Sequence, residues 1–148
     1  MLILLFYKIS TILSHSFFFS VCESVGVADR NIIPDARMTA STYSTYYYPY
    51  YGRLNEQRGR VAWCAKTSSD RTDYLQVDIG AVHSVCAVAI KGAPLDGVWT
   101  TTFKVHLSTG GVIWNAYKEN NKEKVHYSKE VDNINVSVIF SSHSFCFR

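Results

Sequence analysis

The stretch Tyr74-Leu-Gln-Val-Asp-Ile-Gly80 carries the clearest pattern of this 148-residue chain. Its three apolar residues, Leu75, Val77 and Ile79, alternate with polar ones. A period of two residues is typical of a β-strand with one buried face, because successive side chains of a strand point to opposite sides. We therefore expect a strand here, with these three side chains against a core.

The neighbouring segments predict more strands and no helix. Residues 82–90 are almost continuously apolar, as in a strand buried on both sides. Residues 103–107 alternate again, and a turn at residues 109–111 separates them from residues 112–117, which predicts a β-hairpin closed by a glycine turn. Residues 61–65 are apolar and predict a short buried strand. Because no amphipathic helix occurs in this region, the predicted class is all-β.

Six tyrosines and one proline fall within residues 43–51, which we call the tyrosine loop. The stretch follows neither the period of a strand nor that of a helix. Pro49 lacks a backbone N–H and restricts Tyr48 to an extended or turn conformation. Tyrosine suits a recognition surface, because it combines a large, stiff apolar face with a hydroxyl. We predict an aromatic loop on a rigid base; the alternative for any single ring is that it covers the end of the core.

The first 21 residues are mostly apolar but are interrupted by Lys8, His15 and several serines. They are too broken for a membrane span, which needs about 20 nearly uninterrupted apolar residues. A signal peptide with a cleavage site on either side of Cys22 fits better and predicts a secreted, extracellular protein. The alternative is a start that is not cleaved.

Composition excludes several classes of function. The chain has 15 basic and 12 acidic residues, a net charge of +3, so no broad field for nucleic acid is expected. No serine or cysteine motif of the nucleophile-elbow type accompanies the histidines, and Asp70, Asp73 and Asp78 do not have the spacing of an EF-hand loop. We therefore expect no enzyme activity, no cofactor and no metal site.

The four cysteines are Cys22, Cys64, Cys86 and Cys146. Behind a signal peptide an even number predicts disulfides, and four cysteines leave three pairings open. No C-x-x-C spacing points to zinc. The single N-glycosylation sequon begins at Asn135 and matters only in a secreted chain.

Seven separate segments, in this order, resemble the discoidin domain family, also called the coagulation factor V/VIII type C domain: Ile33-Pro-Asp35, Met38-Thr-Ala-Ser41, Gly52-Arg-Leu-Asn55, Ala62-Trp63, Tyr74-Leu-Gln-Val-Asp-Ile-Gly80, the run from Thr101 to Ser108, and Trp114-Asn-Ala-Tyr117. The resemblance covers residues 22–127. It implies a distorted jelly-roll β-barrel or sandwich whose loops at one end, called spikes, bind ligands outside the cell. Known members bind anionic phospholipid, carbohydrate, collagen or other surface proteins.

The tyrosine loop falls at the first spike of this family. The polar loop of residues 66–73 and the loop of residues 92–99 fall at the other two. The loops found from the residues alone are therefore also the ones that the resemblance selects.

The end of the chain departs from the family pattern. A discoidin domain ends in further strands and a final cysteine that pairs with the first, but residues 128–148 form a divergent tail, so the closing strands are expected to be missing. Cys22 matches the opening cysteine, whereas Cys146 follows an unrelated sequence, and the resemblance does not support their pairing. In the family's layout Cys64 and Cys86 lie on neighbouring core segments and are the expected disulfide; the alternative is two buried free thiols.

These observations predict a secreted adhesion or lectin-like module that binds a cell-surface glycan or an extracellular-matrix protein. The basic surplus of residues 43–73 is only two charges, and each adds about 1 kcal/mol against anionic lipid, so a phospholipid surface is the alternative partner. A fragment without function is the third possibility, and the oligomeric state stays open. Arg53 and Trp63 are assigned to the scaffold. The predicted ligand contacts are Tyr46, Tyr47, Tyr48 and Tyr50 for stacking, Asp70 and Arg71 for polar contacts, and Leu95 and Trp99 as an apolar wall.

Overall fold

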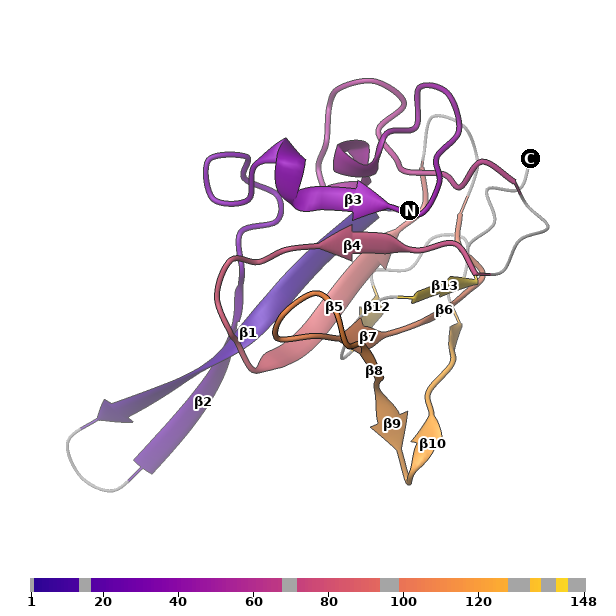
Figure 1. Cartoon of the computed structure of the whole chain (residues 1–148). Coiled ribbons are helices and arrows are strands. Elements are labelled where there is room, and N and C mark those ends of the chain that lie inside the picture. Colours follow the sequence, from indigo (N-terminus) through magenta and orange to yellow (C-terminus); the bar gives the residue numbers. More distant parts are fainter. Residues whose placement is uncertain are drawn as a thin grey trace.

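The structure is a computed structural model of the chain, and it describes residues 2–13, 17–67, 72–93, 99–127, 134–136 and 141–143. Its regular structure consists mainly of antiparallel strands, most of them short, and long loops connect them (Figure 1). The helical elements of the described part are two 3-10 turns, η1 at Asp35–Arg37 and η2 at Pro49–Gly52. The all-β prediction is confirmed.

The largest sheet has four strands in the order β12-β5-β1-β2. These are β12 (Ile134–Val136), β5 (Val85–Lys91), β1 (Leu2–Leu13) and β2 (Phe17–Ser24). β1 lies along β5, and the β1–β2 hairpin projects away from the body of the molecule (Figure 1). In the structure, residues predicted as a signal peptide therefore supply β1 and the beginning of β2. The assignment of residues 1–21 as a signal peptide stays a prediction.

The remaining strands form small sheets around this one. β3 pairs with β4, β7 with β8 and β9 with β10, and β6 lies between β11 and β13. Their bounds are β3 Met38–Ala40, β4 Leu75–Val77, β6 Thr102–Lys104, β7 His106–Leu107, β8 Asn115–Ala116, β9 Lys118–Glu119, β10 Lys122–Glu123, β11 His126–Tyr127 and β13 Ser141–His143. β12 and β13 come from the tail that was expected to diverge.

The main core lies between the β3–β4 pair and β5. Its buried members are Val25, Val27, Ile33, Met38, Trp63, Leu75, Val88, Ile90, Phe103 and Val105. Leu75 is buried as its alternating pattern predicted, and Val77 and Ile79 pack against the same cluster. A second, smaller cluster contains Ala62, Cys64 and Ala93.

Two sequence predictions about strands need correction. Residues 61–64 are buried but form no strand, because Val61 takes a positive φ of 52° and the segment is irregular. The hairpin predicted after residue 103 exists as β7 and β8, but residues 112–114 belong to its exposed loop rather than to a strand. In both cases the segment is apolar but irregular, so apolar composition alone does not predict a strand.

An ion cluster of the buried Arg53 and Glu56 with the partly exposed Asp35 and Arg58 connects residues 25–37 with the segment after η2. Arg53 is only 1% exposed, and it donates hydrogen bonds to the carbonyl oxygen of Val27 at 2.5 Å and to Asp35 at 2.9 Å. Arg58 bridges Asp35 at 3.0 Å and Glu56 at 3.2 Å. Buried charges are tolerated when they are paired and hydrogen-bonded in this way.

Glu56 is the most completely satisfied carboxylate of the ion cluster. It accepts hydrogen bonds from the backbone N–H groups of Gln57 and Arg58, both at 2.9 Å, and pairs with Arg30 at 2.9 Å. Burial by itself raises the pKa of Glu56, but the hydrogen bonds from the Arg58 side chain and from these two N–H groups outweigh it. The pKa is therefore lowered from its ordinary value of 4.5.

We expect Glu56→Gln to lower the free energy of unfolding by about 2 kcal/mol at neutral pH, because hydrogen bonds to a charged group are lost inside the protein. A lowered folded pKa gives stability that is fully present above the unfolded value of 4.5 and is lost as the pH falls through the folded value. Chemical denaturation should be measured between about pH 3 and pH 7, the range in which carboxylates titrate. The free energy of unfolding should fall less on acidification in the variant than in the parent chain.

The matched control is Glu123→Gln, which removes an exposed pair with Lys104 and should change stability far less than Glu56→Gln does. Equal effects of the two substitutions would contradict a supporting role for the ion cluster.

Candidate ligand-binding site

The tyrosine loop follows β3 and ends in η2. Its first part is a tight turn in which Tyr46 takes a positive φ of 71° and the N–H of Tyr47 donates to the carbonyl of Ser44 at 2.9 Å. The N–H of Ser44 donates in turn to the carbonyl of Cys64 at 2.9 Å, which anchors the loop on a buried segment. Tyr48 is extended, with ψ 153°, as expected before Pro49. The prediction of no regular element holds only as far as Tyr48, because the 3-10 turn begins at Pro49.

The rings at the end of the loop pack against one another. Tyr48 stacks on Tyr50 with centroids 5.6 Å apart, and Tyr50 meets Tyr51 edge to face at 4.7 Å. Tyr43 leans on Tyr48 at 5.2 Å. Such pairs stabilise by about 0.5–1.5 kcal/mol beyond the area they bury. These four residues form a preformed aromatic cluster rather than independent rings.

Arg58 connects the aromatic cluster to the ion cluster. Its guanidinium lies 5.6 Å from the ring centre of Tyr50 and 5.7 Å from that of Tyr51 while it bridges Asp35 and Glu56. Burial, and then the proximity of Tyr51, raises the pKa of Tyr50 above its ordinary value of 10.0, so its hydroxyl stays protonated at physiological pH. The ion-paired Arg58 therefore packs against the rings of the tyrosine loop and supports them.

The predicted ligand-contacting tyrosines separate into different roles. Tyr46 is 64% exposed and is open to a ligand. Tyr47 packs against the small buried cluster and Tyr50 against the main core, so both also serve the fold. Tyr48 is half-buried at the centre of the aromatic cluster. Tyr43, at 46% exposure, is a further open ring that the sequence argument omitted, although it begins the same stretch.

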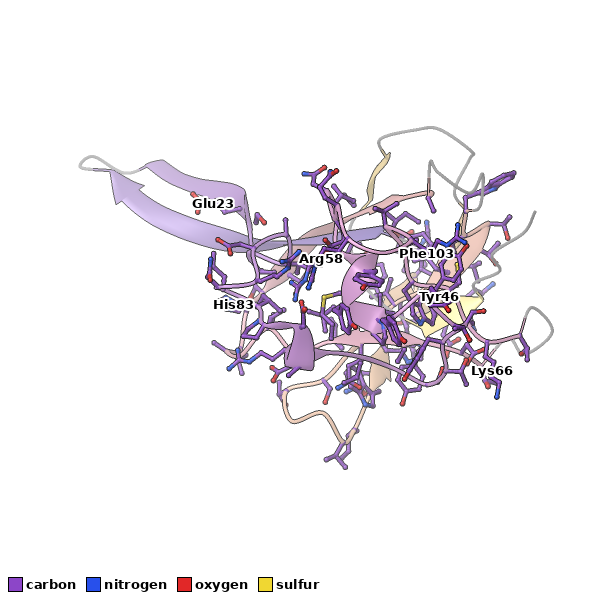
Figure 2. The ribbon with its side chains drawn as sticks, turned by 90° about the horizontal axis from the view of Figure 1, so that it is seen from above. Glu23, Tyr46, Arg58, Lys66, His83 and Phe103 are labelled. Atoms are coloured by element: carbon purple, nitrogen blue, oxygen red, sulfur yellow. The ribbon has the colours of Figure 1, made fainter. Side chains whose placement is uncertain are left out.

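The other predicted contacts are described only in part. Asp70, Arg71 and Leu95 lie outside the described residues, and Trp99 is half-buried. Figure 2 shows Tyr46 and Lys66 close to the same end of the molecule, with His83 at the opposite end. The assignment of these residues as ligand contacts stays a prediction.

Asp73 is a structural residue that sequence reasoning did not place. It is buried and accepts hydrogen bonds from the hydroxyls of Ser41 at 2.6 Å and Thr42 at 2.7 Å. The backbone N–H of Lys66 also donates to the Thr42 hydroxyl, at 3.1 Å. The base of the tyrosine loop is thus tied to both ends of the loop of residues 66–73.

The scaffold assignments of Trp63 and Arg53 agree with their burial, at 1% exposure each, and the Trp63 ring N–H donates to the carbonyl of Thr42 at 2.9 Å. Cys64 is disulfide-bonded. Because the side chain of Cys86 is outside the description, the pairing of the two stays a prediction, as does glycosylation of Asn135 in β12.

In the ranges that the structure describes, no three His, Cys, Asp or Glu side chains gather as metal ligands would. Over the same ranges, none of the helical elements has the length and apolar character that crossing a bilayer requires.

Comparison with known proteins relates the chain to one domain family and to lactadherins. The family model described as F5/8 type C domain matches residues 37–142. The chain is 34% identical over 126 residues to lactadherin of Mus musculus, covering 76% of this chain and 27% of that protein. It is 33% identical over 106 residues to lactadherin of Bos taurus, covering 66% and 24%. The chain thus spans about a quarter of the length of these curated relatives.

The different packing of the tyrosines leads to a stability test. Tyr50→Ala removes a ring that contacts the core, Tyr48, Tyr51 and Arg58, and we expect it to lower the free energy of unfolding by roughly 2–3 kcal/mol. Tyr46→Ala removes an exposed ring and should change stability by less than about 0.5 kcal/mol. Urea denaturation of both variants checks the contrast; similar losses would show that Tyr46 is also part of the packed structure.

Proposed function

Because the chain belongs to the F5/8 type C, or discoidin, domain family, we propose that it is an extracellular recognition module that binds glycans of cell-surface or matrix proteins through the tyrosine loop. The observation that carries this proposal is the exposure of Tyr46, and of Tyr43 at the edge of the aromatic cluster, on a loop whose remaining rings are packed and braced. An open aromatic face with a hydroxyl at its edge can stack on a sugar ring and hydrogen-bond its hydroxyl groups.

The bracing of the loop supports binding of a ligand that offers only weak individual contacts. Ordering a mobile loop during binding opposes association, and a loop that is already ordered avoids that loss. Here the N–H of Ser44, the stacked ring of Tyr48 and the cation of Arg58 hold the loop in the absence of ligand. Affinity for a single glycan would remain modest, and several copies on one surface would raise it by avidity.

Local charge favours a polar ligand over an anionic lipid surface. Of the five basic residues within residues 43–73, Arg53 and Arg58 are already ion-paired with Asp35 and Glu56. Little positive charge then remains to attract acidic headgroups, each contact of which adds about 1 kcal/mol. Tyrosine rings also favour an interface or a polar ligand over hydrocarbon. A phospholipid surface is therefore the second candidate partner, to be separated by experiment.

An extracellular location is part of the same proposal. The disulfide of Cys64 fits an oxidising compartment, and the apolar residues 1–21 fit a secretory signal. The module itself is proposed to be non-catalytic and to act by adhesion.

The proposal is tested with the full chain on an array of immobilised glycans and, in parallel, on vesicles that contain phosphatidylserine. The double variant Tyr43→Ala/Tyr46→Ala should bind the glycans roughly five- to 150-fold more weakly, since two ring contacts of about 0.5–1.5 kcal/mol each are lost. Trp114→Ala is the matched control, because it removes a similarly exposed aromatic ring from the groove that His83 lines, at the opposite end of the molecule.

Undiminished glycan binding by the double variant would show that the tyrosine loop is not the site. Binding to the vesicles alone, lost in the same variant, would replace the glycan by a phospholipid as the partner.

A further inference from the structure

A groove of about 1180 Å³ lies on a part of the molecule that the proposed glycan site does not use. One wall is formed by β4 and the loop that follows it, residues 74–83, and the other by the β7–β8 hairpin, residues 106–111 and 113–115. His83 lines this groove, and Figure 2 places it at the end of the molecule away from Tyr46. The groove is therefore distinct from the tyrosine loop.

The walls of the groove present large apolar side chains to solvent. Val82 is 77% exposed and Ile113 76% exposed, and Leu107 and Trp114 are exposed beside them. Burial lowers the pKa of His106, which keeps this lining residue neutral at physiological pH. Exposed apolar side chains that gather along one groove mark a site of interaction.

The backbone of β4 supplies the second observation. Within the described residues β4 pairs on one side only, with β3. The N–H of Ser41 donates to the carbonyl of Tyr74 at 3.0 Å, and the N–H of Asp78 donates to the carbonyl of Arg37 at 2.9 Å. Residues that bond to a given neighbour alternate along an antiparallel strand, so Tyr74, Gln76 and Asp78 are the ones that face β3.

The intervening residues, Leu75 and Val77, therefore turn their N–H and C=O groups to the opposite edge of β4. Both residues also line the groove. The groove thus combines, on one wall, a strand edge that has no partner strand among the described residues with exposed apolar side chains around it. An extended peptide satisfies both at once, because its backbone pairs with the edge and its alternate side chains reach the apolar walls.

We propose that this groove binds an extended segment of a partner protein as an added strand on the free edge of β4. The segment carries apolar side chains at alternate positions, which pack against Val82, Ile113 and Trp114. A flat lipid surface does not fit this site, because lipid tails offer no hydrogen bonds to the N–H and C=O groups of Leu75 and Val77. The proposal is independent of the tyrosine loop and of its ligand.

The test uses the full chain and a fluorescent peptide that alternates valine and threonine, with binding followed by fluorescence anisotropy. Ile113→Asp should weaken binding by at least about tenfold (about 1.4 kcal/mol), because it places a charge on the groove wall. Val112→Asp is the matched control: Val112 is the preceding residue and is even more exposed, at 85%, but it does not line the groove. Its affinity should stay within about twofold of the parent (about 0.4 kcal/mol).

A second probe examines the strand edge. The same peptide with methyl groups on alternate backbone nitrogens keeps its side chains but loses the N–H donors that would pair with β4, and it should bind far more weakly. The Tyr43→Ala/Tyr46→Ala variant should bind the unmodified peptide as the parent does, which keeps this result separate from the glycan experiment.

Four outcomes would overturn the proposal. Equal weakening by Ile113→Asp and Val112→Asp, or equal binding of the methylated peptide, would indicate unspecific apolar adhesion. A lack of saturable binding of the unmodified peptide would show that the groove does not take an extended strand as its ligand. Concentration-dependent dimerisation in sedimentation equilibrium that Ile113→Asp abolishes would identify a second copy of the chain as the occupant instead.

Discussion

The pairing of a buried guanidinium is the constraint on which the architecture around the tyrosine loop depends. Arg53 is enclosed by the fold, and a buried cation left without partners would be strongly destabilising. Its contacts with the Val27 carbonyl and with Asp35 hold residues 25–37 against the segment after η2. Asp35 then holds Arg58, which also pairs with Glu56 and covers the tyrosine rings. One network of charges therefore joins the packed interior to the surface that we assign to recognition.

A second set of polar contacts holds the other side of the loop. Thr42 accepts the Trp63 ring N–H through its carbonyl and donates its hydroxyl to Asp73, which also binds the hydroxyl of Ser41. Two loops that are distant in sequence, residues 43–51 and 66–73, thus start from one hydrogen-bonded base. Placing recognition residues on loops above a rigid β-scaffold lets their sequence vary while the supporting strands stay fixed.

Local patterns sufficed where one face of a strand is buried. The alternation of residues 74–80 predicted a strand, and the structure has one over Leu75–Val77, with Leu75 in the core and Val77 and Ile79 packed against it. Composition failed at Val61, where long-range packing buries an irregular segment with a positive φ. The tyrosine stretch identified the candidate site, but it could not distinguish Tyr46 from Tyr50. The two tyrosines differ only in their surroundings: Tyr50 contacts Arg58 and the core, whereas Tyr46 is exposed. These contacts come from residues outside the tyrosine loop, so the pattern of the loop itself does not reveal them.

The disulfide of Cys64 has a consequence for when the recognition surface takes shape. The backbone carbonyl of this residue accepts the N–H of Ser44, so the covalently fixed segment is also the floor of the tyrosine loop. A newly made chain in a reducing compartment has this floor without its cross-link, and the loop is then less restrained. Under the extracellular role that we propose, oxidation of Cys64 would order the aromatic surface before the chain meets its ligand.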